Sequence, residues 1–252
     1  MNDQTVLAFG CHPDDVEFTC AGTLALLKRA GWRVHLATLT GGECGSIELG
    51  REAIRKVRLA ECAASAAVLD GEFTWAGGED LEIEFSSELR ARTVDDIRKA
   101  RPDHVITQPP SDYMIDHEET SKLVRHACFG APMPNVPSPE FEPIDHVPAL
   151  VYTDAMDSAD IFGRAVPVGF FVDITSVIDV KAEMLACHAS QRDWLRRHHG
   201  VDEYIELMKR QSAARGERAG VKYAEAFTQH LGHGYPHTNL IAEALTDHVV
   251  LA

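Results

Sequence analysis

Short apolar runs alternate with longer amphipathic segments over the first half of the chain. The apolar runs predict buried strands over 6–10, 34–39, 73–76 and 105–108. Apolar residues at helical spacing predict helices over 19–30, 51–69, 86–100 and 118–128. This alternation of strands and helices indicates an α/β fold, with a Rossmann-like, mostly parallel sheet and helices on both of its faces.

The second half of the chain is less regular. Six prolines between 131 and 148 exclude a regular helix and predict a long loop. Further strands are expected over 150–153 and 170–174, and further helices over 176–199 and 202–216. Residues 224–252 have no clear period and are interrupted at 232–236. We therefore expect one domain over 1–252, with a Pro-rich loop at 131–148 and a C-terminal helical extension over about 200–252.

The composition is that of an ordinary globular protein with an acidic balance. Of the 252 residues, 45% are hydrophobic and 25% are charged, and the formal net charge is −15. Nucleic acids and anionic membranes are bound through Lys and Arg, so this charge argues against both as partners. The six cysteines are scattered, and neither a signal peptide nor a membrane-length apolar run is recognisable. We expect a cytoplasmic protein that acts on a small molecule.

The first predicted strand leads directly into the turn His12-Pro13-Asp14-Asp15. Ligands of open α/β sheets bind at the carboxyl ends of the strands. His12 and Asp15 lie three positions apart on this turn, so both can face one cation, and Asp14 between them can accept a proton. A plainer interpretation is that the aspartates only cap a helix.

A third metal ligand is needed for a catalytic site, because zinc enzymes usually supply three protein ligands and keep one position for water. His117 follows the fourth predicted strand, as His12 follows the first, and is the best candidate. Together with Asp15 these residues form a His₂Asp set. Zinc suits this set best, and iron(II), cobalt or manganese also fit the residue types.

Several segments together resemble the PIG-L/LmbE family of zinc-dependent de-N-acetylases and amidases, which act on N-acylated sugars. They are His12-Pro13-Asp14-Asp15, Thr40-Gly41-Gly42-Glu43, Arg58-x-x-Glu61 and Asp116-His117. Lys181 and the stretch His188-Ala189-Ser190-Gln191 are similar to a later helix of that family. The resemblance covers about the first 195 residues and leaves about 55 residues unassigned.

The resemblance implies a site and a reaction. The implied metal ligands are His12, Asp15 and His117. Asp14 would be the general base, and Asp116 would lie behind the ligands and orient one of them. The implied substrate contacts are Glu43, Arg58 and Met114. The implied reaction is the removal of an acetyl group from an N-acetylated amino sugar or its conjugate.

The chain departs from the family pattern at Met114. Family members usually carry His-Pro-Asp-His, whose first histidine helps to stabilise the oxyanion or to protonate the departing amine. The matching stretch here is Met114-Ile115-Asp116-His117, and a thioether can do neither. The candidates to replace this imidazole are His188, His233 and Tyr113. His233 is also a candidate substrate contact.

Other functions remain open. An amidase with the same site would cleave a different amide, such as that of a thiol conjugate. A nucleotide-binding Rossmann protein is disfavoured, because no GxGxxG follows the first strand. A non-catalytic metal-binding relative is favoured by Met114. We also expect a homo-oligomer, since members of the family commonly assemble and the C-terminal segment must bury its apolar residues.

Overall fold

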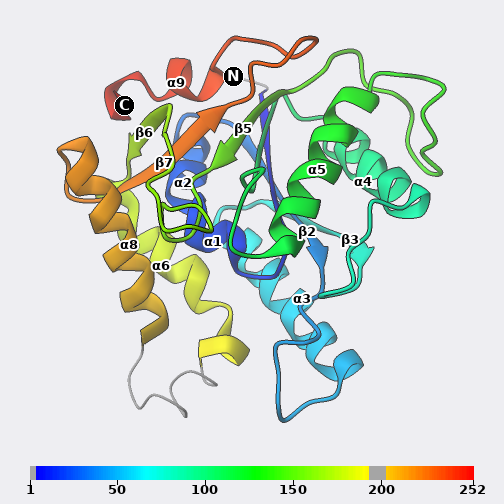
Figure 1. Ribbon diagram of the computed structural model, residues 1–252, viewed down its shortest axis with the longest axis horizontal. Coiled ribbons are helices and arrows are strands. Elements are labelled where there is room, and N and C mark those ends of the chain that lie inside the picture. The colour runs from blue at the N-terminus through cyan, green and yellow to red at the C-terminus, as the bar shows by residue number, and fades with distance from the viewer. Residues whose placement is uncertain (1–3, 193–202) are drawn as a thin grey trace.

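A single sheet of eight strands forms the centre of the molecule in the computed structural model, which describes residues 4–192 and 203–252 (Figure 1). The strands are β1 (Thr5–Gly10), β2 (Arg33–Thr40), β3 (Glu72–Gly78), β4 (His104–Thr107), β5 (Ala149–Thr153), β6 (Phe170–Asp173), β7 (Ala224–Gln229) and β8 (Val249–Leu251). Their order in the sheet is β3-β2-β1-β4-β5-β7-β6-β8. The first five strands in that order are mutually parallel, whereas β7 and β8 run antiparallel to their neighbours. The predicted mostly parallel α/β fold is confirmed.

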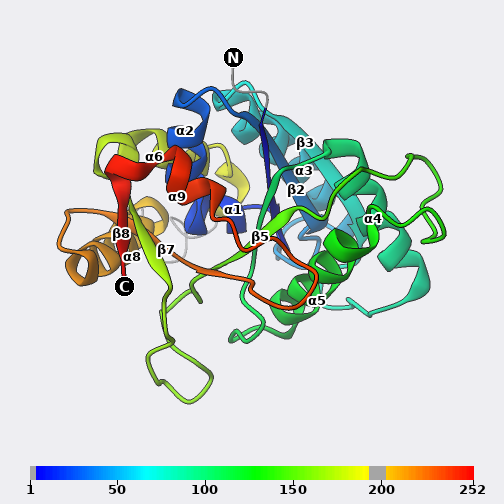
Figure 2. The same cartoon turned by 90° about the horizontal axis from the view of Figure 1, so that it is seen from above.

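Helices cover both faces of this sheet. They are α1 (Asp15–Thr19), α2 (Ala21–Arg29), α3 (Arg51–Val68), α4 (Ser87–Ala100), α5 (Ile115–Gly130), α6 (Ile178–Ala186), α8 (Glu203–Ala219) and α9 (Leu240–Ala244). Figure 2 shows α2 and α6 on one side of the sheet and α4 and α5 on the other. No helix among the described residues has both the length and the apolar character needed to span a membrane.

The two faces of the sheet contribute to separate hydrophobic cores. On β1, Val6 and Ala8 pack into the core shared with α2 and α6, while Leu7 and Phe9 pack into the core shared with α4 and α5. Alternate side chains of a strand point to opposite faces, so a strand that is covered on both sides must be apolar throughout. This is why the central strands were recognisable as continuous apolar runs.

Two predicted helices are interrupted in the structure. The helix expected over 19–30 begins earlier, as α1, and is broken at Cys20 before α2 starts. The helix expected over 176–199 ends at Ala186, and its part beyond residue 192 lies outside the described residues. The chain leaves the helix at Cys187, and the His188 side chain that follows is buried beside Glu17. Helical structure resumes at residues 189–192, so His188 marks a break within the expected helix.

The C-terminal segment, expected as a helical extension, is only partly helical. After α8 the chain forms β7, which lies between β5 and β6 inside the sheet, and later β8 at its edge. The strand was missed because Glu225 interrupts its apolar pattern. The Glu225 carboxylate is buried, with the Lys181 ammonium 2.5 Å away, and it accepts hydrogen bonds from the backbone N–H groups of Gly22 and Thr23.

The Pro-rich segment 131–148 has no regular helix or strand, as predicted. Arg98 on α4 donates hydrogen bonds to four of its carbonyl groups. Asp95, also on α4, accepts from the backbone N–H groups of Glu140 and Phe141. The loop is therefore held against α4.

Candidate metal centre

The carboxyl ends of β1, β2, β3 and β4 meet at one rim of the sheet, because these strands are parallel neighbours. The turn that contains His12 follows β1, and the segment that ends at His117 follows β4. Strand β3 delivers Asp80 to the same rim. Residues that are far apart in the sequence are thus brought together by the topology of the sheet.

Side chains of His12, Asp15 and His117 converge there, as expected. One potential ligand atom from each lies within 4.8 Å of the others. The distance is 3.5 Å from His12 Nδ1 to Asp15 Oδ2, and also 3.5 Å from His117 Nε2 to Asp15 Oδ1. All three residues are buried. The Asp15 Oδ2 atom accepts hydrogen bonds from the N–H groups of Cys11 and His12 and from the Gln108 amide, so Oδ1 is the oxygen left for a cation.

Carboxylates hold the outer nitrogen atoms of both histidines. His117 Nδ1 lies 3.1 Å from Asp112 Oδ1. His12 Nε2 lies 3.1 Å from Asp80 Oδ1 and 3.4 Å from Asp116 Oδ2. Carboxylates in this position fix the ring orientation of metal-binding histidines. They leave Nδ1 of His12 and Nε2 of His117 facing Asp15.

The electrostatics of the cluster favour a cation. Although burial alone would lower the pKa of both histidines, Cys11 and the nearby carboxylates raise the pKa of His12, and Asp15 and Asp112 raise that of His117. The two imidazoles in turn lower the pKa of Asp15 despite its burial. Several carboxylates around two imidazoles form an environment in which a divalent ion can replace the bound protons. The donor set therefore fits a metal.

A second potential group, formed by Cys11, His12 and Asp116, is a weaker choice. Burial raises the pKa of the Cys11 thiol to about 11, and a thiol binds metal as the thiolate. Asp116 Oδ2 also accepts a hydrogen bond from the Leu81 N–H group. This contact holds the Asp116 carboxylate 3.4 Å from His12 Nε2, and its role in orienting that ligand stays a prediction.

Asp14 lies beside the three converging residues in a strained backbone conformation. Its φ is 101°, a left-handed value that non-glycine residues rarely adopt and that is common at functional sites. The Asp14 Oδ2 atom accepts hydrogen bonds from Arg58 Nη2 at 3.2 Å and from the Tyr204 hydroxyl. Burial raises the pKa of Asp14, although Arg58 opposes the effect.

A cavity of about 470 Å³ opens above this cluster, and we call it the metal pocket. Its lining residues are His12, Asp14, Asp15, Phe18, Cys44, Gly45, Arg58, Asp80, Leu81, Tyr113, Met114, His117, Met156, Gln191 and Leu207. Three residues expected near the substrate, Arg58, Tyr113 and Met114, are therefore at the pocket wall. The Tyr113 ring packs edge-on against His117, with 5.4 Å between ring centroids.

Glu43, expected to contact the substrate, does not line the metal pocket. Its carboxylate is buried and accepts hydrogen bonds from Arg55 and from the N–H group of Asp80. It therefore anchors the segment that carries Asp80. The substrate contact expected of Glu43 stays a prediction, and its second oxygen, Oε2, is buried without a hydrogen-bond partner among the described residues.

The two histidines proposed to replace the missing imidazole are also placed elsewhere. His188 is fully buried, and its Nε2 atom lies 3.3 Å from Glu17 Oε1; this carboxylate raises the pKa of the ring against the effect of burial. His233 is exposed on the loop after β7, whose Tyr235 hydroxyl donates to the carbonyl of Arg125. Arg125 lies eight residues beyond His117 on α5, about 12 Å along a helix. Neither histidine lines the metal pocket.

Three further residues of the site were not expected. Asp80 follows the end of β3, so the strand-end argument that identified His117 could have found it. Asp112 could have been found by its closeness in sequence to His117. Nothing in the local sequence links Tyr204 on α8 to Asp14, since 190 residues separate them.

The sheet and this cluster define an α/β protein with a group of potential metal ligands at the carboxyl ends of its parallel strands. Residues 7–128 match the family described as PIG-L: GlcNAc-PI de-N-acetylase. The predicted resemblance to the PIG-L/LmbE family is confirmed by this match.

Individual relatives include a deacetylase and a hydratase. The chain is 29% identical over 192 residues to diacetylchitobiose deacetylase of Thermococcus kodakarensis; the match covers 74% of this chain and 69% of the relative. It is 24% identical over 196 residues to 4-oxalmesaconate hydratase of Pseudomonas putida; this match covers 75% of this chain and 74% of the relative. The solved structure of N,N'-diacetylchitobiose deacetylase from Pyrococcus horikoshii has a TM-score of 0.76 at 24% identity, and the match covers 95% of this chain and 89% of that one. This likeness demonstrates the shared fold.

Proposed function

We propose that this protein is a metal-dependent hydrolase that removes an acetyl group from an N-acetylated amino sugar or a conjugate of one. The observation that carries the proposal is the convergence of His12, Asp15 and His117 beside Asp14 at one pocket. Two of the relatives described above are named as deacetylases of diacetylchitobiose, which supports this substrate class.

Zinc is the ion that we propose for His12, Asp15 and His117. Two imidazoles and one carboxylate form a donor set typical of zinc hydrolases, and iron(II), cobalt and manganese share the same ligand types. When bound, such an ion would polarise the amide carbonyl and lower the pKa of water.

Asp14 is the proposed general base. Arg58 and Tyr204 both donate to Oδ2, and among the described residues no group donates to Oδ1. The Oδ1 atom is thus free to take a proton from the attacking water. A carboxyl group whose pKa is raised is also a stronger base once it is ionised, which suits proton transfer near neutral pH.

Tyr113 is the proposed hydrogen-bond donor to the oxyanion, in place of the missing imidazole. Its side chain lines the metal pocket beside His117. Although 64% of the residue is exposed, its partial burial raises the pKa of the hydroxyl to about 12, so the group stays protonated and can donate. Met114 at the same wall offers an apolar contact for the acetyl methyl group.

The proposal is tested by assaying the metal-loaded protein on N-acetylglucosamine, N,N'-diacetylchitobiose and an N-acetylcysteine conjugate of a sugar. We expect equal amounts of acetate and free amine from at least one N-acetyl sugar. Asp14→Asn should lower kcat by about 10²–10⁴-fold while the metal content stays unchanged. The exposed Asp179→Asn is the matched control and should retain activity. If no substrate releases amine, the proposed deacetylation is refuted, and the hydration described next or a non-catalytic role would have to be considered.

Hydration of a carbon–carbon double bond is the second candidate function. It is favoured by Met114, because a hydratase has no departing amine to protonate. The hydratase relative supports this alternative. Turnover of an unsaturated dicarboxylate without any deacetylation would establish it.

Two further properties stay predictions. A cytoplasmic location is supported by the six free cysteines. A homo-oligomer is supported by the apolar residues Ile161 and Phe162, which are exposed in the segment between β5 and β6. Sedimentation that gives only monomer at micromolar concentration would exclude the oligomer.

A further inference from the structure

Arg58 on α3 is a cation at the wall of the metal pocket, yet only 5% of its surface is exposed. Its Nη2 atom donates hydrogen bonds to the carbonyl of Pro13 at 2.7 Å and to Asp14 Oδ2 at 3.2 Å. Its Nη1 atom donates to the carbonyl of Gly42 at 3.0 Å. The Nε atom is buried without a hydrogen-bond partner among the described residues. The donors of Arg58 are thus directed at the protein, and little of the side chain is left for a substrate.

The guanidinium joins two segments that follow neighbouring parallel strands. Pro13 and Asp14 lie on the turn after β1, and Gly42 lies on the loop after β2. A planar guanidinium can hold several acceptors in fixed directions, which the ammonium group of a lysine cannot do. Arg58 therefore fixes the turn after β1 relative to the loop after β2.

The turn that Arg58 holds is strained at the proposed general base. Asp14 has a φ of 101°, and a non-glycine residue keeps such a conformation only where the surrounding structure enforces it. Arg58 binds the carbonyl that directly precedes Asp14 as well as its Oδ2 atom, so it holds both the backbone and the side chain. The direction of Oδ1, the proposed proton acceptor, is set in this way.

Two glycines in the loop after β2 make room for the guanidinium. A Cβ atom at Gly42 would lie 2.3 Å from Arg58 Nη1, and a Cβ atom at Gly45 would lie 2.5 Å from the same atom. Both distances are far below van der Waals contact. Even alanine at either position would therefore displace the guanidinium or the loop.

We propose that Arg58 is a positioning residue for Asp14, and that Gly42 and Gly45 allow its guanidinium to reach the turn. Arg58 acts by holding the carboxylate of the base in the direction that proton transfer requires. This inference rests on the proposed hydrolase function. It assigns Arg58 a role other than the substrate contact that the family resemblance implies.

The test compares kcat and KM of the zinc-loaded parent, Arg58→Lys and Gly42→Ala on the N-acetyl sugar that the parent hydrolyses fastest. Lysine keeps the charge and loses the planar fork, whereas alanine at position 42 displaces the fork and leaves Arg58 in the sequence. Both variants should lower kcat about 10–100-fold, because a small misplacement of a catalytic group is costly. Their KM and zinc content should stay within about twofold of the parent values.

Gly220→Ala is the matched control for Gly42→Ala. Gly220 has a φ of 73°, close to the 63° of Gly42, but a Cβ atom there would meet nothing within 4 Å. Alanine introduces similar backbone strain at both positions, so both variants should lose stability in urea unfolding. Gly220→Ala should nevertheless keep the kcat of the parent, because it does not displace Arg58.

Combination with Asp14→Asn separates positioning from a direct substrate contact. If Arg58 acts through Asp14, Arg58→Lys should change kcat by less than about twofold in the Asp14→Asn background. A loss of the same size in both backgrounds would overturn the proposal, because Arg58 would then act on the substrate itself.

Two other results would also overturn it. One is a parent-like kcat in Gly42→Ala, and the other is a raised KM with unchanged kcat in Arg58→Lys. These results would leave the proposed hydrolase function intact. A parent protein that releases no amine would instead remove the hydrolase function and this inference together.

Discussion

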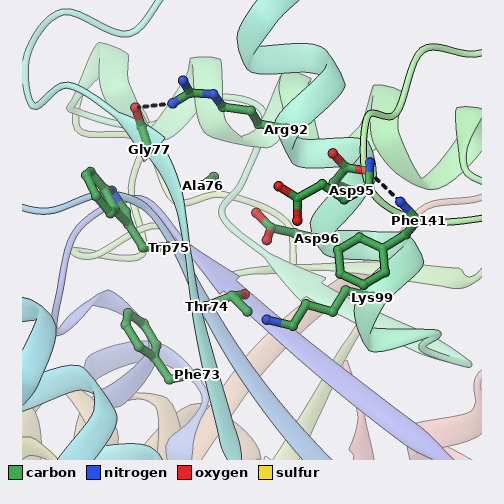
Figure 3. A pocket seen from close by; sticks show the side chains of 11 residues that line it. Phe73, Thr74, Trp75, Ala76, Gly77, Arg92, Asp95, Asp96, Lys99 and Phe141 are labelled. Carbon is green, nitrogen blue, oxygen red and sulfur yellow. Dashed lines mark hydrogen bonds between the residues drawn. The ribbon is translucent and has the colours of Figure 1, made fainter.

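Replacing Asp96 by asparagine should make the protein more stable above neutral pH. The pKa of this carboxyl group, on α4 (Figure 3), rises from an ordinary 3.8 to about 7 because the residue is buried. A raised pKa means that the stability contributed by the protonated form is complete below about pH 4 and is lost as the pH rises through 7. Asparagine cannot ionise and avoids this loss.

The size of the effect follows from the same values. Each tenfold change in proton affinity corresponds to about 1.4 kcal/mol, so ionisation destabilises the folded state by up to about 4 kcal/mol at pH 8. At pH 5 the carboxyl group is largely protonated in the folded protein but largely ionised in the unfolded chain. The folded state is then destabilised by about 1.5 kcal/mol. We therefore expect the advantage of Asp96→Asn to grow by about 2–3 kcal/mol between these pH values.

Urea unfolding of the parent protein, Asp96→Asn and the exposed control Asp179→Asn at pH 5 and pH 8 measures this difference. The control should follow the parent at both pH values. An Asp96→Asn variant that is no more stable than the parent at pH 8 would refute the reasoning, because the buried carboxylate would then have a partner that compensates its charge. A gain of the same size at both pH values would also refute it, since the effect would not come from ionisation.

Three other changes have defined outcomes. His117→Ala should lose its bound metal, measured by elemental analysis of the purified protein, and retained stoichiometric metal would identify a different third ligand. Tyr204→Phe keeps the ring but removes a hydrogen bond to Asp14, so kcat should fall about tenfold with little change in KM; an unchanged kcat in steady-state assays would leave Tyr204 with a packing role. Lys181→Met leaves a buried carboxylate unpaired and should destabilise the protein by about 3–5 kcal/mol in urea unfolding, and a loss below 1 kcal/mol would show that the pair is solvated.

Much of the metal site was recognisable from the sequence, because its residues follow strands whose apolar runs are continuous. His12 and Asp15 come directly after β1, His117 lies in the first turn of α5 after β4, and parallel strands end at one rim. The strand-end rule was not applied to β3, and Asp80 was missed although the same rule covers it.

Other parts of the site depend on contacts between distant segments, which local patterns do not encode. Glu43 and His188 carry the residue types of a catalytic group, yet their side chains are buried beside Arg55 and Glu17 and neither lines the metal pocket. Tyr204 looked like an ordinary aromatic residue of a helix, and only the packing of α8 brings its hydroxyl to Asp14.

The sequence by itself determined the alternation of strands and helices, the rim at which the site is built and the three residues that converge there. It did so because hydrophobic period and strand-end position are local properties of the chain. The tertiary structure decided which polar groups are free and which are already paired. It also placed β7 inside the sheet, since the buried charge of Glu225 is tolerated only when Lys181 from a distant helix meets it.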